Sequence, residues 1–276
     1  MFRPENNFQL GVFDINGTLC TGKDGLTDTI KNGFKNLRAQ SIQTTVVTGR
    51  GTGGAKALLG DDWDKIVSPG MPIGVENGAR LVAEDGSNLR FHRIKKTTLD
   101  AVIDATLLAD GAVDYLAYTP QEPGAKDVLW LPKGKSPKEY LLANGRHVEI
   151  MDESVTRFAA RVGCDKACML RVGTQSPEVN GLFEGMNFFL NQTELNVLPD
   201  GVNKATGVTD IAEYAGVALS RVLVAGNDYN DLPMLDLPVA RKIFIPDTPE
   251  LRPSSADVIS LASPQELGAY LWGVGA

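Results

Sequence analysis

A strand, a helix and a second strand follow one another near the start of the chain, and this succession leaves few folds open. Residues 8–13 are a short apolar run bounded by polar and glycine residues, which is typical of a buried strand. Residues 25–40 carry apolar side chains at helical spacing, from Leu26 to Leu37, and residues 44–47 are β-branched. Two strands joined by such a helix form a βαβ unit, so the sequence predicts a parallel sheet.

The C-terminal part repeats this alternation. Lys204 precedes a stretch with apolar residues at helical spacing, and two further apolar runs follow it. We therefore expect an α/β protein whose core is a doubly wound parallel sheet of the Rossmann type. The predicted elements are helices at 208–215, 232–235 and 265–272, and strands at 221–225 and 243–245.

The middle of the chain has a different pattern. Its hydrophobic periodicity changes often, and proline and glycine residues form clusters. This pattern favours an α+β domain inserted at 84–185, with the parallel-sheet core formed by 1–83 and 186–276. Within the inserted domain we expect helices at 98–109, 137–143 and 177–183, and strands at 128–131, 156–162 and 167–172.

Composition excludes several classes of protein. The chain has 27 Lys and Arg residues against 34 Asp and Glu residues, so its net charge is −7 and it lacks a basic field for nucleic acid or an anionic membrane. No apolar run approaches the roughly 18 residues of a membrane helix, and residues 1–7 do not begin a signal peptide. Three cysteines make no disulfide framework. We expect a cytoplasmic monomer or homodimer that acts on a small molecule.

Three polar clusters, at 14–18, 48–50 and 226–231, directly follow three of the predicted strands. Ligands of open parallel sheets bind beyond the carboxyl ends of the strands, so these clusters converge if the strands are neighbours. Asp14 is either a nucleophile toward phosphorus or a cap of the following turn. The third cluster offers either oxygen ligands for Mg²⁺ or an Asx-rich turn that caps a helix.

Taken together and in chain order, these residues resemble the motifs of the haloacid dehalogenase superfamily of phosphotransferases. The resemblance covers roughly residues 8–83 and 188–245. Residues 76–79 (ENGA) also resemble the branch that carries a large inserted α/β cap, which includes sucrose-phosphate and mannosylphosphoglycerate phosphatases. The four motifs are DINGTL at 14–19, VVTGR at 46–50, GVNKA at 201–205 and GNDYNDLPML at 226–235.

The resemblance implies a phosphoric monoester hydrolase that depends on Mg²⁺, acts on a sugar phosphate and forms an aspartyl phosphate on Asp14. Phosphoryl oxygens would be held by Thr48, Gly49 and Lys204. The implied metal ligands are Asp14, the main-chain carbonyl of Asn16, Asn227, Asp228 and Asp231, and the implied substrate-positioning residues are Arg50, Asn77 and Asn230.

Two positions depart from the family pattern. Asn16 replaces the aspartate that serves as general acid and base, and Asn227 replaces an aspartate that binds the metal. General acid–base catalysis contributes typically about 10²–10⁴-fold, so the first change predicts slower hydrolysis. Both changes also suit a catalytically weak or inactive relative that binds a phosphorylated ligand. A phosphosugar mutase is a further alternative, and no motif favours phosphonate or dehalogenation chemistry.

Overall fold

The computed structural model describes residues 8–21, 25–122, 124–138, 140–141, 148–191 and 194–275. Residues 1–7, for which no signal peptide was predicted, and parts of the predicted helix 137–143 lie outside these ranges. The chain divides into two compact units. The core unit consists of Met1–Arg90 and Asn203–Ala276, and the inserted unit consists of Phe91–Val202.

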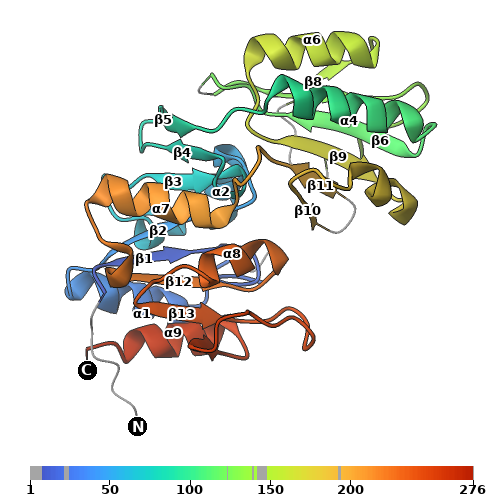
Figure 1. Ribbon diagram of the computed structural model, residues 1–276. Coiled ribbons are helices and arrows are strands. Elements are labelled where there is room, and N and C mark those ends of the chain that lie inside the picture. Colours follow the sequence, from blue (N-terminus) through green and yellow to red (C-terminus); the bar gives the residue numbers. More distant parts are fainter. Residues whose placement is uncertain are drawn as a thin grey trace. The chain divides into compact units, whose positions relative to one another are not determined.

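A parallel sheet of five strands forms the centre of the core unit, in the order β14-β13-β12-β1-β2. Figure 1 shows the orange and red strands of the C-terminal part beside the blue N-terminal strands. Every residue of β1 and β12 is buried, as expected when helices cover both faces of a parallel sheet. The predicted α/β core is therefore confirmed. Its strands are β1 (Leu10–Phe13), β2 (Gln43–Val46), β12 (Val222–Gly226), β13 (Arg241–Phe244) and β14 (Val258–Ser260).

The helices of the core unit follow the predicted apolar spacing. The first of them buries Ile30, Phe34 and Leu37 and begins after Thr27, whose side chain accepts a hydrogen bond from the Ile30 amide. No helix in the described part of the chain is long and apolar enough to cross a membrane. The α-helices are α1 (Asp28–Ala39), α2 (Thr52–Leu59), α3 (Trp63–Ile66), α7 (Lys204–Ala215), α8 (Leu232–Leu235) and α9 (Pro264–Trp272), and the short 3₁₀ turns are η1 (Gly60–Asp62), η2 (Glu76–Gly78), η4 (Leu219–Arg221) and η5 (Tyr229–Asp231).

Two glycines allow α1 and α9 to approach each other closely. A Cβ atom on Gly268 would lie 2.5 Å from the carbonyl carbon of Thr29, and one on Gly33 would lie 2.8 Å from the carbonyl oxygen of Gly268. We expect Gly268→Ala to lower the free energy of unfolding by about 1–3 kcal/mol, because overpacking forces the two helices apart. Urea denaturation measures this, with Gly273→Ala as the control, since a Cβ there meets its nearest atom only at 3.6 Å. Equal stability of the two variants would contradict the prediction.

A small antiparallel sheet of three strands, β3-β4-β5, completes the core unit. The sequence did not predict it, because each strand has only three or four residues and β5 is partly exposed on both faces. The hairpin between β4 and β5 keeps residues up to Arg90 in the core unit, which therefore extends beyond the predicted limit at residue 83. The strands are β3 (Ile73–Val75), β4 (Arg80–Val82) and β5 (Asn88–Phe91).

The inserted unit is an α+β structure with a six-stranded sheet in the order β10-β11-β9-β6-β7-β8. Its described pairs are antiparallel except for β7 and β8. Helices α4 and α6 pack side by side (Figure 1) and share an apolar core with the sheet. The elements are α4 (Lys96–Leu108), β6 (Val113–Tyr118), β7 (Asp127–Trp130), β8 (Val148–Met151), α6 (Val155–Asp165), β9 (Leu170–Thr174), η3 (Pro177–Phe183), β10 (Phe188–Asn191) and β11 (Glu194–Val197).

The prediction of a strand at 156–162 is wrong, because this segment belongs to α6. Val155, Phe158 and Val162 are buried at helical spacing, and the Ser154 side chain accepts a hydrogen bond from the third amide of the helix. The predicted boundary at residue 185 also differs from the structure. Strand β11 pairs with β9 and β10 pairs with β11, so the inserted unit continues to Val202.

Candidate active site

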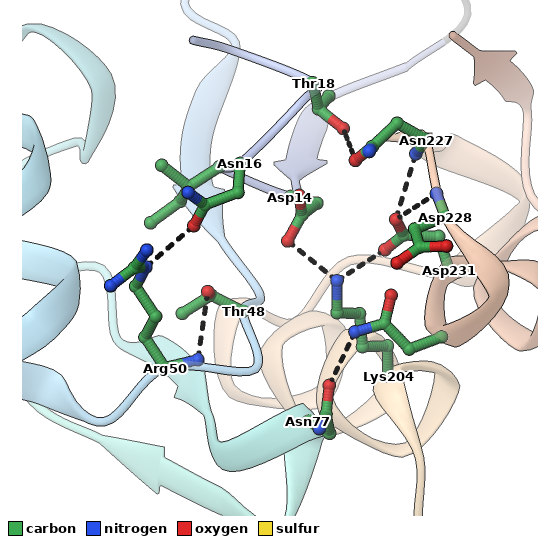
Figure 2. A network of polar contacts seen from close by, with 12 residues as sticks. Asp14, Asn16, Thr18, Thr48, Arg50, Asn77, Lys204, Asn227, Asp228 and Asp231 are labelled. Carbon is green, nitrogen blue, oxygen red and sulfur yellow. Dashed lines mark hydrogen bonds and ion pairs between the residues drawn. The ribbon is translucent and has the colours of Figure 1, made fainter. Parts of the chain in front are cut away.

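The predicted site residues gather at the carboxyl ends of β1, β2 and β12 and at the start of α7, all within the core unit (Figure 2). These three strands are adjacent in the sheet. The three polar clusters that follow them therefore converge, as the sequence predicted.

Asp14 is the first residue after β1, and its surroundings fix it firmly. Its main-chain amide donates a hydrogen bond to the Ala225 carbonyl at 2.9 Å, which extends the pairing of β1 with β12. Its side chain is buried, and Oδ1 accepts a hydrogen bond from Lys204 Nζ at 2.7 Å. The same ammonium lies 2.6 Å from Asp231 Oδ1. One lysine is thus shared by two buried carboxylates.

This arrangement holds more negative than positive charge. Burial raises the pKa of Asp14 from its ordinary value of 3.8 to about 7, the charge of Asp231 adds to the rise, and Lys204 opposes it. Burial alone would lower the pKa of Lys204, but the two carboxylates raise it to about 12. The lysine is therefore a permanent cation, and the site still has room for further positive charge.

The N-terminus of α7 places Lys204. Asn203 caps this helix by accepting a hydrogen bond from the Ala205 amide, and its own amide donates to Thr206 Oγ1. Gly78 has a φ of +82°, and a Cβ there would lie 2.4 Å from the Asn203 carbonyl oxygen. The turn η2 therefore packs directly on the start of α7 and sets the position of the lysine.

Asp231 organises the loop that follows β12. Its Oδ2 accepts hydrogen bonds from the main-chain amides of Asn227 and Asp228, at 2.9 and 3.1 Å. Asp228 in turn accepts a hydrogen bond from the amide of Tyr229 at 2.7 Å. The loop thus forms a capping box, which is the structural role that the sequence left open beside metal binding.

Asn227 packs on the turn that follows Asp14. Its Oδ1 accepts a hydrogen bond from Thr18 Oγ1 at 2.8 Å, and both side chains are buried. A Cβ at Gly17, where φ is +81°, would lie 2.1 Å from Asn227 Nδ2. Only glycine therefore permits this contact, which the sequence analysis did not predict.

Asn16 is held by Arg50. The Arg50 Nε donates a hydrogen bond to Asn16 Oδ1 at 2.7 Å (Figure 2). A guanidinium group has only donors, so the amide oxygen of Asn16 must face Arg50 and its NH₂ group is directed elsewhere. The main-chain amide of Arg50 also donates to Thr48 Oγ1 at 3.2 Å, which orders the loop after β2.

Asn77 connects the loops that follow β2 and β12. Its main-chain amide donates to the Thr48 carbonyl, and its Oδ1 accepts a hydrogen bond from Asn230 Nδ2, both at 2.9 Å. A Cβ at Gly49 would lie 3.1 Å from Asn77 Oδ1, so glycine suits this position. Asn77 has a φ of +56°, a left-handed conformation that asparagine tolerates better than most residues.

The oxygen donors of the site suit a hard cation. Among the described residues, no three His, Cys, Asp or Glu side chains form a group that could hold a metal ion. The predicted set instead combines the carboxylates of Asp14 and Asp228, the Asn227 amide and the main-chain carbonyl of Asn16, and Mg²⁺ accepts all three donor types. Burial raises the pKa of Asp14, and a cation beside the carboxylate would favour its ionised form. The residues therefore fit Mg²⁺.

The structure brings every predicted site residue into the same region and adds three more. Gly17 and Thr18 contact the Asn227 side chain. Both lie inside the first motif, so the sequence contained the information needed to predict them. Asp247 follows β13, where its side chain is hydrogen-bonded to Asn227, and its pKa is raised by partial burial and by nearby carboxylates. A search of the loop after the fourth strand would have found it.

Comparisons with known proteins agree with this site. The family model for haloacid dehalogenase-like hydrolases matches residues 12–238. The HMP-PP phosphatase of Enterobacter sp. (strain 638) is 26% identical over 237 residues, which cover 82% of this chain and 80% of that protein.

Two solved structures show the same fold. The phosphatase BT1666 from Bacteroides thetaiotaomicron has a TM-score of 0.74 at 18% identity, covering 97% of this chain and 96% of that one. The subclass IIB sugar phosphatase BT4131 has a TM-score of 0.75 at 16% identity, covering 94% and 95%. The predicted relation to the branch with an inserted α/β domain is confirmed, and the named phosphatases support the predicted phosphoric monoester hydrolase. Because the family model spans most of the chain, this protein belongs to the haloacid dehalogenase-like hydrolases.

Proposed function

We propose that this protein is a Mg²⁺-dependent phosphatase that hydrolyses a small phosphorylated metabolite through an aspartyl phosphate on Asp14. The observation that carries the proposal is the buried contact of Asp14 with Lys204 at the carboxyl end of β1. A carboxylate held this rigidly is a competent nucleophile, and the adjacent ammonium compensates the charge of an approaching phosphoryl group. The family and the phosphatases among the relatives support this assignment.

In the proposed reaction, the carboxylate of Asp14 attacks phosphorus and the leaving group departs. Lys204 fixes the carboxylate through Oδ1 and lowers the repulsion between two anions. We assign the binding of phosphoryl oxygens to the Thr48 hydroxyl and the Gly49 amide, in the loop that follows β2. Water then cleaves the aspartyl phosphate and regenerates Asp14.

We assign the metal ligands to Asp14, Asn227, Asp228 and the main-chain carbonyl of Asn16. A bound Mg²⁺ would neutralise phosphoryl charge and polarise phosphorus. Asp231 was also a predicted ligand. Its two oxygens already accept hydrogen bonds from Lys204 and from two main-chain amides, so we propose that it orients these groups instead.

The composition, with only three cysteines in the chain, supports a cytoplasmic enzyme, and we propose that it acts as a monomer or homodimer. Sugar phosphates are the substrate class that the sequence predicted and that BT4131 is named for. The identity of the leaving group is considered in the next subsection.

Phosphate release by the purified protein tests the proposal. The assay contains Mg²⁺ and a panel of sugar phosphates, acyl phosphates and phosphoric anhydrides, with Asp14→Ala as the background control. Turnover that the control lacks would support the proposal. Isomer formation without phosphate release would indicate a mutase. If neither protein releases phosphate but Mg²⁺ and a phosphorylated compound bind together, the protein is a binding relative, as Asn16 and Asn227 would allow.

Asn227→Asp should strengthen Mg²⁺ binding by about tenfold or more, because a carboxylate adds charge at a ligand position. The rise in melting temperature with Mg²⁺ concentration measures this affinity without any need for turnover. Asn230→Asp is the matched control, since it adds the same charge to the same loop beside Asn77 rather than beside Asn227. If both variants bind Mg²⁺ equally well, Asn227 has no special role in metal binding.

A further inference from the structure

The family pattern has its general acid at the position of Asn16, and in this structure the orientation of the asparagine side chain is fixed by a hydrogen bond. It lies two residues beyond Asp14, on the turn at the carboxyl end of β1. Its Oδ1 accepts the hydrogen bond from Arg50 Nε at 2.7 Å. The side chain can therefore offer only its N–H donors to any group on its other side.

An amide at this position can stabilise a departing anion, but it cannot protonate it. The N–H of Asn16 donates a hydrogen bond without releasing a proton near neutral pH. Its partner, Arg50, uses Nε to donate the hydrogen bond to Asn16 Oδ1. Neither member of the pair can serve as a general acid.

Two charged groups beside Asp14, Lys204 and Asp231, are held in structural contacts. The Lys204 ammonium lies between two buried carboxylates, at 2.7 and 2.6 Å, so it donates to them. Both oxygens of Asp231 accept hydrogen bonds. None of the four side chains of this network, Asn16, Arg50, Lys204 and Asp231, is therefore free to deliver a proton to a leaving oxygen beside Asn16.

We propose that this site selects its substrate by the acidity of the leaving group, and that its substrates are phosphoric anhydrides or acyl phosphates rather than phosphate esters of sugar alcohols. The inference rests on the proposed function, because it concerns the first step at Asp14. It narrows the sugar-phosphate class that the sequence predicted to a class whose leaving group needs no proton.

The chemistry of the first step explains this selection. An oxygen of Asp14 bonds to phosphorus, the bond from phosphorus to the leaving oxygen breaks, and its electron pair stays on that oxygen. A carboxylate, with a conjugate acid of pKa about 4, or a phosphate monoester, with a second pKa of about 6, leaves as a stable anion. An alkoxide resembles hydroxide, which is a far stronger base than a carboxylate or a phosphate, and therefore needs a proton as it leaves.

The second step balances without a base on the protein. Water attacks the phosphorus of the aspartyl phosphate, and the bond to Asp14 breaks with its electron pair remaining on the carboxylate. Both protons of the water stay on the inorganic phosphate that is released. Because Asn16 cannot act as a general base, hydrolysis of the aspartyl phosphate is slowed equally for every substrate. The leaving group affects only the first step.

The test compares acetyl phosphate and inorganic pyrophosphate with glycerol 3-phosphate and glucose 6-phosphate, in the presence of Mg²⁺. The quantity measured is kcat/KM, which reports the steps up to loss of the leaving group. We expect Asn16→Asp to raise kcat/KM for the two esters by about 10²-fold relative to acetyl phosphate, through restored general acid catalysis. The gain lies at the lower end of the usual range because Arg50 favours an ionised carboxylate at position 16.

Two features make this comparison decisive. The ratio of kcat/KM for an ester to kcat/KM for acetyl phosphate is measured on one protein preparation. A fraction of unfolded protein lowers both values equally and leaves the ratio unchanged. Asn16→Ala also lacks a proton donor, and it should keep the substrate preference of the wild type.

The possible outcomes separate the inference from the proposed function. The inference is overturned if the wild type hydrolyses the esters as efficiently as acetyl phosphate, or if Asn16→Asp leaves the ratio of their kcat/KM values unchanged. In either case another group supplies the proton, and the phosphatase assignment stands. If no compound, acetyl phosphate included, is hydrolysed in a way that depends on Asp14, the proposed function fails and the inference fails with it.

Discussion

Lys204→Met is expected to lower the free energy of unfolding by about 3–5 kcal/mol, because it leaves two buried carboxylates without the cation that they share. Lys204 is 1% exposed, and its ammonium contacts Asp14 at 2.7 Å and Asp231 at 2.6 Å. Methionine fills a similar volume, so the loss reflects charge rather than packing. Urea denaturation in the presence of EDTA measures the change without any contribution from a bound metal.

Lys242→Met provides the matched control. This lysine is also buried, on the neighbouring strand β13, but its ammonium contacts Ser255 and the exposed Asp257. Removing the charge leaves a solvated carboxylate, so we expect a cost of about 1 kcal/mol or less. A similar loss in both variants would show that Lys204 acts only through its aliphatic stem, and would remove the electrostatic argument for the site.

Asp14→Asn should abolish turnover, by roughly 10⁴-fold or more, without weakening the fold. An asparagine oxygen can still accept the hydrogen bond from Lys204, which then has a single carboxylate partner, Asp231. The pKa of Asp14 is raised to about 7 from 3.8 by burial, so its ionised form costs folding free energy. In EDTA, the variant should therefore be more stable than the wild type at pH 8.

The pH dependence of this difference follows from the direction of the shift. A carboxyl group whose pKa is higher in the folded state binds its proton more tightly there, so the wild type loses stability as pH rises from about 4 to 7. The advantage of Asp14→Asn should grow over that range and then level off. Urea denaturation at several pH values measures it, and a variant that is less stable at pH 8 would contradict the account.

The core of the fold was predictable because its signals are local. Each buried strand is a short apolar run that ends at a polar loop, and the rule for parallel sheets brings those loops together. Asp14 and Thr48 were identified for this reason and Lys204 from its place before a predicted helix, and the structure brings all three together at one edge of the sheet. The amphipathic spacing of α1 was equally clear.

Other features depend on contacts between distant parts of the chain. Strands β10 and β11 belong to the inserted unit because β11 pairs with β9 and β10 pairs with β11, and their own residues do not show this. The segment 156–162 was assigned to a strand, although its burial pattern is helical once Val155 is included. The bond between Thr18 and Asn227 joins residues 209 positions apart, which no local pattern indicates.

The contact of Asn16 with Arg50 explains how the asparagine that replaces the family's aspartate is oriented in the site. The sequence showed an amide where the family has an acid. The structure shows that its oxygen is occupied, so that only donors are left. An amide oriented in this way is consistent with a site that still binds phosphate but lacks a proton donor.

Identification of a phosphorylated residue tests the central claim most directly. The purified protein is mixed with Mg²⁺ and acetyl phosphate labelled on phosphorus, quenched in acid within the first turnover, digested and analysed by mass spectrometry. The account predicts one phosphoryl group, on Asp14, that hydroxylamine removes and that forms in neither Asp14→Asn nor Asp14→Ala. Because Asn16 provides no general base, this species should persist longer in the wild type than in Asn16→Asp. Steady turnover with no labelled Asp14, or a label on another residue, would contradict the account.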